Sequence, residues 1–274
     1  MTPNQYCTQK VAHRGTDLYY GLFALAREKR FAVTAIHAYY AAINEIPERC
    51  KEESVALKKL QWWREEIELT FAKCMPRHPI TQALLNPIKN YQLPQQLFLG
   101  IIDGIENYLA NSRIATYQDL ILHCHHTTSL REMLVAYVID KITKENLSFA
   151  RDLGSALHII EIINHLRPDI MKGWLYLPQD DLVRFSVNEV DLLHFKSSVG
   201  LSKLLHELAN KIRLCYMQAS KALPIEAKKL HLCQLIQAEI ALKLLQVMER
   251  DQFAVLQKLY ILPAIKKLWV AWRV

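Results

Sequence analysis

"HIIEIINHLRPDIMKGWLYLP", residues 158–178, combines an apolar helical pattern with titratable side chains at regular intervals. Four such groups recur at spacings of three, four and four residues: His158, Glu161, His165 and Asp169. Side chains three and four residues apart lie on the same side of an α-helix. The spacing therefore predicts one polar stripe, which faces either a cavity or a polar seam between packed helices.

Composition predicts an all-α chain organised as one domain over residues 1–274. Only seven glycines interrupt 274 residues that are 51% hydrophobic, and long runs are rich in Leu, Ala, Ile, Lys and Glu. Pro47 is expected to end the first helix. The connections between predicted helices are short, which favours a compact bundle. The predicted helices cover 17–45, 54–73, 80–90, 94–112, 116–141, 147–165, 187–195, 200–222, 225–250 and 252–272.

Several classes of protein are disfavoured by what the sequence lacks. It contains no GxGxxG, GxxxxGK[ST] or GxSxG motif and no run of about 18 apolar residues. Six widely spaced cysteines without a CxxC pair indicate reduced thiols, so we expect a cytoplasmic protein. The net charge of +7 suits anionic partners, but the basic residues are dispersed and no nucleic-acid motif occurs, so no nucleic-acid partner is expected.

A second helix also ends in polar side chains. The aromatic-rich stretch "IHAYYAAINEIPERC" brings Asn44, Glu45 and Glu48 close together near its end. It lies about 120 residues before the stripe that ends at Asp169. Two apolar helices with acidic ends can face each other across a cavity and hold a metal cation between them.

Together the two stretches resemble the signatures of the squalene/phytoene synthase family, the head-to-head branch of the all-helical isoprenoid synthases. "HAYYAAINEIPE" follows the family's "YAFCR" and Asp-Asp-x-x-Asp pattern without a gap and places Asn44, Glu45 and Glu48 at the aspartate positions. Residues 60–68, 78–84, 101–109 and 117–134 match further family blocks. The second signature is kept at Gly154, Ala156, Asp169, Gly173, Tyr176, Leu177 and Pro178.

This resemblance implies a helical bundle around a central cavity and a set of site residues. In active members, the two aspartate groups bind Mg²⁺ ions that grip the diphosphates of two prenyl donors. Carried over by position, the catalytic residues are Glu45, Glu48 and Asp169, and the metal ligands are these three with Glu161. The substrate-binding positions are Tyr40, Asn44, His158, Glu161, His165 and Tyr176.

The chain departs from the family pattern at most of the charged positions. Only Asp169 remains Asp among the five expected, and His165 replaces an oxygen ligand by a nitrogen that suits Mg²⁺ poorly. Asn164 and Trp174 stand where the family has Arg. The chain therefore lacks two guanidinium groups that would each bind diphosphate oxygens through paired hydrogen bonds. We therefore expect a divergent, non-catalytic member that binds an isoprenoid ligand without a cofactor.

The alternative is an active prenyltransferase that uses Mg²⁺ to condense farnesyl or geranylgeranyl diphosphate. Glu45, Glu48, Glu161 and Asp169 supply enough carboxylates for two ions. Within the superfamily, "LPQDDLVRFSV" and "LPAIKKLWVAWRV" resemble the mitochondrial assembly factor of respiratory complex I. That likeness implies a protein partner and a role in assembly.

Two further segments have a functional and a structural interpretation. "HCHH" at 123–126 is typical of zinc sites only when a second ligand pair is present, so core or surface histidines are expected here. "LYILPAIKKLWVAWRV" mixes basic residues with tryptophans. It predicts either a last helix packed on the core with a solvated basic side, which is favoured, or a helix peripheral to a membrane.

Overall fold

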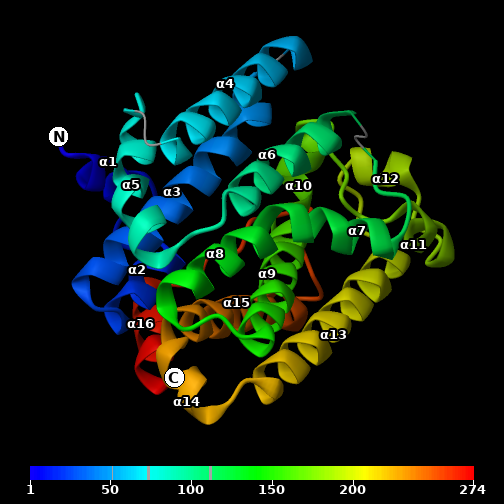
Figure 1. The fold of residues 1–274 in the computed structure, drawn as a ribbon. Coiled ribbons are helices and arrows are strands. Elements are labelled where there is room, and N and C mark those ends of the chain that lie inside the picture. The colour runs from blue at the N-terminus through cyan, green and yellow to red at the C-terminus, as the bar shows by residue number, and fades with distance from the viewer. Residues whose placement is uncertain (51, 73–74, 111–112) are drawn as a thin grey trace.

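The computed structural model describes residues 1–50, 52–72, 75–110 and 113–274 and confirms the predicted all-α fold (Figure 1). Within these ranges no β-strand occurs, and one isolated bridge joins Arg113 to Leu175. The elements are α1 (Pro3–Val11), α2 (Asp17–Gly21), η1 (Leu22–Ala24), α3 (Arg27–Arg49), α4 (Glu53–Phe71), α5 (Pro79–Tyr91), α6 (Gln95–Ala110), α7 (Tyr117–Cys124), the π-helical turn η2 (His125–Ser129), α8 (Leu130–Ile139), α9 (Lys144–Asn164), α10 (Leu166–Met171), α11 (Gln179–Arg184), α12 (Glu189–Leu193), α13 (Val199–Ala222), α14 (Ile225–Leu230), α15 (Leu232–Arg250) and α16 (Ala264–Arg273).

Two large hydrophobic cores divide the bundle. The first joins buried side chains of the N-terminal helices to α8, and the second joins α9 to α13, α15 and the segment that precedes α16. Helix α9 contacts α7, η2, α8, α13 and α15, and it occupies the middle of the fold in Figure 1. Its residues therefore lie at the boundary between the two cores.

Helix α9 begins and ends at residues that the sequence specifies. The side chain of Thr143 accepts a hydrogen bond from the backbone N–H of Asn146 and caps its start. Pro168 has no N–H to donate to the carbonyl of Asn164, and α9 ends at that residue. After a turn at His165, α10 continues the chain with Pro168 in its first turn.

Several helix predictions differ from the structure. The predicted helices 17–45, 116–141 and 225–250 are each divided into shorter elements. Pro47 lies inside α3, which continues to Arg49, because a proline so near the end removes little of the hydrogen bonding. The N-terminal helix α1 was not predicted. The expected helix over 252–272 starts only at Ala264, because Gln252 and Phe253 adopt left-handed backbone conformations and Pro263 precedes the new helix.

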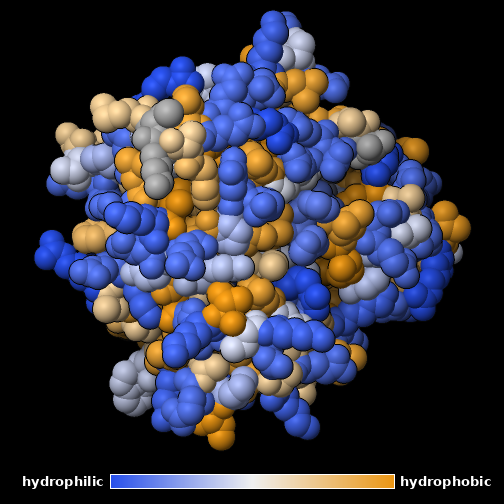
Figure 2. Space-filling view, in the orientation of Figure 1, coloured by the Kyte–Doolittle hydropathy of each residue, from blue (hydrophilic) through white to orange (hydrophobic). Residues whose placement is uncertain are grey.

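One face of the molecule is mainly hydrophilic (Figure 2), and the described cysteines are not paired with one another. Figure 2 shows a mainly hydrophilic face over α4, α6 and α13, with hydrophobic side chains emerging between the helices. Among the described residues, no helix is long and apolar enough to cross a bilayer. Cys7, Cys50, Cys124, Cys215 and Cys233 are free thiols, and Cys74 lies outside the described residues.

Candidate functional site

A cavity of about 280 Å³ opens between the end of α3 and the end of α9. It lies where the two cores meet, and α10 with the segment after it closes one side. All nine residues predicted from the sequence line this cavity, although their roles stay predictions: Tyr40, Asn44, Glu45, Glu48, His158, Glu161, His165, Asp169 and Tyr176.

The carboxylates near the end of α3 form ion pairs with basic side chains. Glu45 accepts from Lys10 at 2.8 Å and also pairs with Arg49 at 2.8 Å. Across the cavity, Lys172 Nζ lies 2.9 Å from a carboxylate oxygen of Glu48. Lys10 lies on α1, a helix that was not predicted from the sequence. The ion pair between Lys10 and Glu45 could therefore not be predicted either.

A chain of hydrogen bonds links α3 to α9 through the π-helical turn. The hydroxyls of Tyr40 and Thr128 are 2.8 Å apart, and the Thr128 hydroxyl lies 3.0 Å from Nδ1 of His158. Nε2 of His158 is buried and has no hydrogen-bond partner among the described residues. The protein thus holds the His158 ring through Nδ1 alone among the described residues.

An aromatic wall forms the opposite side of the cavity. The rings of Tyr108 and Tyr176 stack with centroids 4.7 Å apart, and His123 stacks on Tyr176 at 5.2 Å. Burial, with a smaller effect of the neighbouring imidazoles, lowers the pKa of His123 to about 3, so its ring stays neutral. Sequence reasoning missed His123 as a lining residue, because the histidine cluster gave no sign of which member faces inward.

A second cavity of about 470 Å³ adjoins the first and shares Tyr40, Ala41, Glu161 and His165 with it. Aliphatic side chains from α9, α15 and the segment before α16 form much of its lining: Leu157, Ile160, Ile240, Leu244, Ile261 and Leu262. Burial lowers the pKa of His37, whose Nε2 has no partner among the described residues. Polar and charged side chains complete the lining of this second cavity, among them Asp17, Arg131, Asn164, Gln237 and Lys267. Together the two cavities lie within the size range of ligand sites.

Among the described residues, one guanidinium lines the second cavity, and it is paired with a carboxylate. Arg131 donates to Glu132 at 2.7 and 2.9 Å and lies 4.5 Å from the ring centroid of Tyr40. Its partner Glu132 is fully buried. Arg131 therefore stabilises a buried anion of the protein, which leaves it less available to an anionic ligand.

The donor set does not fit the Mg²⁺ ions that the resemblance implied. Within the described ranges, no three His, Cys, Asp or Glu side chains converge closely enough to hold a metal ion. Burial of Asp169 raises the pKa of its carboxyl to about 6, despite the nearby His165 and Lys172. Hard divalent cations need several ionised oxygens, and here basic side chains occupy the carboxylates of Glu45 and Glu48.

Comparison with known proteins places this arrangement in a family. The family model for squalene/phytoene synthase matches residues 11–266. The chain belongs to the squalene/phytoene synthase family. The predicted family is thereby confirmed, including the likeness to synthases and to an assembly factor.

Two relatives of this family member differ in the role that their names give. A phytoene synthase of Arthrospira platensis is 24% identical over 277 residues, which cover 96% of this chain and 89% of that protein. The "NADH dehydrogenase (ubiquinone) complex I, assembly factor 6" of Rattus norvegicus is 22% identical over 251 residues, 90% of this chain and 75% of that one.

Solved structures share the fold. A dehydrosqualene synthase in complex with a ligand has a TM-score of 0.90 at 17% identity and covers 99% of this chain and 94% of its own. The squalene synthase HpnC from Alicyclobacillus acidocaldarius has a TM-score of 0.79, also at 17% identity, and covers 92% and 94%. This family member therefore has the isoprenoid synthase fold.

Proposed function

We propose that this family member binds an uncharged isoprenoid-type molecule in its two adjoining cavities and acts through binding or assembly instead of condensing prenyl diphosphates. The observation that carries the proposal is the pairing of Glu45 and Glu48 with Lys10, Arg49 and Lys172. These are the carboxylates that would have to turn toward Mg²⁺ in a synthase.

Ionisation of a diphosphate needs cations that neutralise the charge of the leaving group. The carboxylates that could hold such ions at α3 are already neutralised by the protein itself. Breaking the Glu48–Lys172 pair would also release a lysine that lies 5.5 Å from the ring centroid of Trp174. The ion pairs therefore favour a cavity that is stable without metal.

The polar groups left free in the cavities suit a neutral head group. His158 and His37 each present a buried Nε2 without a partner among the described residues. An imidazole nitrogen can bond to a hydroxyl or a carbonyl, whereas a diphosphate needs several cationic donors. Beyond this head-group site, the aliphatic lining of the second cavity favours an apolar chain.

A role in assembly is supported by the relative from Rattus norvegicus, whose printed name is that of a complex I assembly factor. On this proposal, the ligand-bound chain contacts a protein partner. Capture of a defined partner only by the ligand-bound form would support this part of the proposal.

Filling the second cavity tests the binding proposal. Ala241 on α15 lines this cavity and is buried, so Ala241→Phe places a ring in the space that the apolar chain would occupy. We expect farnesol to bind at least about tenfold more weakly to this variant, measured by isothermal titration calorimetry.

The matched control is Ala222→Phe, which adds the same ring at an exposed position at the end of α13. It should bind farnesol as the parent does, and melting curves should show both variants folded. Unchanged affinity of a folded Ala241→Phe variant would rule out this cavity as the ligand site.

The second candidate function is the Mg²⁺-dependent condensation of two prenyl diphosphates. One observation favours it, because Glu45, Glu48, Glu161 and Asp169 all line one cavity. Rearrangement of Lys10 and Lys172 would be required before these carboxylates could hold metal. A turnover measurement distinguishes the two functions.

A further inference from the structure

Helix α16 packs with one of its three basic side chains inward. Lys267 is only 9% exposed, and its Nζ lies 2.6 Å from Asp17 Oδ1 and 2.8 Å from the carbonyl oxygen of Gly15. Val270 is the other buried residue of the helix. The favoured prediction of a core-packed last helix is confirmed, because α16 contacts α2 and α15, and Lys266 and Arg273 are exposed as that prediction expected. The buried position of Lys267 was not predicted.

The outward side of α16 is mainly apolar. Ile265, Leu268, Trp269 and Trp272 follow at spacings of three, one and three residues, which places them on one stripe, and they are 51–83% exposed. Ile261, just before the helix, is 75% exposed. Exposed apolar side chains gathered in this way mark an interaction surface more often than scattered single ones do.

The charges beside this apolar stripe have one sign. Residues 252–274 contain Lys258, Lys266, Lys267 and Arg273 and no Asp or Glu. Lys266 and Arg273 lie one turn to either side of Trp269 along the helix, and the Arg273 guanidinium stacks on Trp269 at 4.5 Å. Such a surface is complementary to anionic groups at an apolar boundary.

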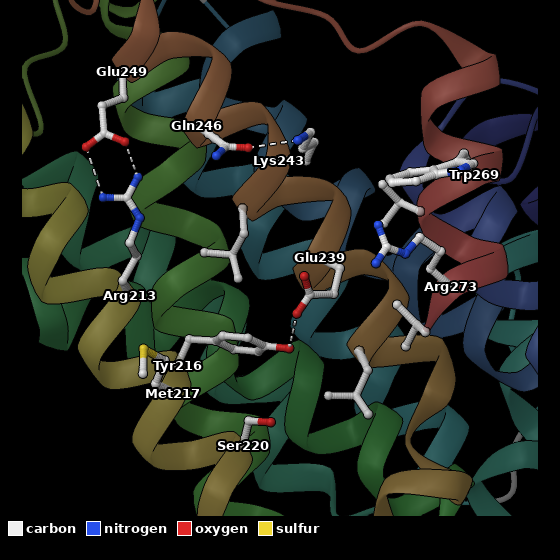
Figure 3. A pocket seen from close by; sticks show the side chains of 14 residues that line it. Arg213, Tyr216, Met217, Ser220, Glu239, Lys243, Gln246, Glu249, Trp269 and Arg273 are labelled. Carbon is white, nitrogen blue, oxygen red and sulfur yellow. Dashed lines mark hydrogen bonds and ion pairs between the residues drawn. The ribbon is translucent and has the colours of Figure 1, made fainter.

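A groove beside α16 is lined by the cations Arg213, Lys243 and Arg273 and by the carboxylates Glu239 and Glu249. It measures about 870 Å³ and lies between α13, α15 and α16, with Trp269 and Arg273 on one wall (Figure 3). Arg213 is held by Glu249 across the groove, whereas Lys243 bonds only to the neutral Gln246 in the part of the chain that the structure describes. Lys243 and Arg273 can therefore meet a phosphate.

We propose that α16 docks this protein on the surface of a membrane that contains anionic phospholipid. The apolar stripe would enter the boundary between head groups and acyl chains, where tryptophan is favoured, and Lys266, Arg273 and Lys243 would contact phosphates. The ten-residue helix is too short to span a bilayer, so it lies along the surface.

Docking on this side brings the second cavity next to the lipid. Ile261, Leu262 and Lys267 line that cavity, and Ile261 also continues the exposed apolar stripe. An apolar molecule dissolved in the membrane would thus reach the cavity without crossing water. This route rests on the proposed function, whereas the docking itself does not.

Vesicle flotation tests the docking with the full chain. The parent should float with vesicles of phosphatidylcholine and phosphatidylglycerol, bind vesicles of phosphatidylcholine alone more weakly, and be released by salt. The double variant Ile265→Glu, Trp272→Glu should partition at least about tenfold more weakly into the anionic vesicles. Reversal of the exposed cations in Lys266→Glu, Arg273→Glu keeps the apolar stripe and should remove the preference for anionic lipid.

The control is Val183→Glu, Val199→Glu, which makes the same charge change at side chains that are 80% and 74% exposed on the opposite side of the bundle (Figure 1). It should float like the parent.

Equal flotation of the parent and both α16 variants would overturn the proposal, as would a parent that binds no vesicles. If light scattering instead found a dimer that the α16 variants dissociate, the face would be an interface between copies. Failure of farnesol binding with normal flotation would contradict the proposed function alone.

Discussion

Replacing Arg131 by methionine should lower the free energy of unfolding by about 3–5 kcal/mol. Burial disfavours the charge on Arg131, but Glu132 offsets this cost, and the pKa of Arg131 lies above its usual value. Without the guanidinium, the fully buried Glu132 carboxylate would keep only Gln234, which donates to it at 2.7 Å. Chemical denaturation with parallel fluorescence and circular dichroism measures the loss.

Two variants separate this effect from a general response to losing an arginine. Arg131→Met, Glu132→Gln removes the uncompensated charge and should recover most of the stability. Arg151→Met breaks a pair with Asp152 at 2.9 Å on the surface and should cost less than about 1 kcal/mol. A loss at Arg131 no larger than the loss at Arg151 would show that the buried pair is unimportant.

Gly154→Ala should lower the free energy of unfolding by about 2–3 kcal/mol. A Cβ at this position on α9 would lie 2.4 Å from Cα and 2.7 Å from N of Ser129, so it would meet the backbone of the π-helical turn. Backbone atoms cannot rotate away, and the helix would have to separate from the turn that carries Thr128. The clash outweighs the gain of about 1 kcal/mol that alanine brings to a helix interior.

Gly100→Ala on α6 is the control for this glycine. Its added Cβ would lie 2.7 Å from Cδ1 of Leu130, the end of a flexible side chain that can move. Thermal and chemical unfolding should therefore place Gly100→Ala within about 1 kcal/mol of the parent. Equal stabilities for the two alanine variants would contradict the close contact between α9 and the turn.

The all-α fold could be predicted from the sequence, as could the meeting of the motifs around Glu45 and Asp169 at one cavity. Both predictions depend on helical periodicity. The spacing of His158, Glu161, His165 and Asp169 follows from the period of the helix, and the gap-free family match brought Glu45 and Glu48 to the same place. Those inferences need only local geometry and one resemblance that spans the chain.

The partners of these groups depend on packing that no local pattern encodes. Lys10 reaches Glu45 from a helix that lacks a strong apolar period, and Lys172 meets Glu48 from the C-cap residue of α10. The position of the His123 side chain in the cavity also follows from tertiary contacts, as does the buried position of Lys267 on α16. The first rests on the stacking with Tyr176 and the second on the ion pair with Asp17. The ion-pair partners of the cavity residues were therefore harder to predict than the positions of those residues.

The most direct test of the proposed function is pyrophosphate release from farnesyl or geranylgeranyl diphosphate in the presence of Mg²⁺. We expect no release above the rate without protein, and no C30 or C40 product, from a preparation that binds farnesol. Sustained release with such a product, lost in Glu45→Gln and in Asp169→Asn, would contradict it and establish a Mg²⁺-dependent prenyltransferase at this cavity.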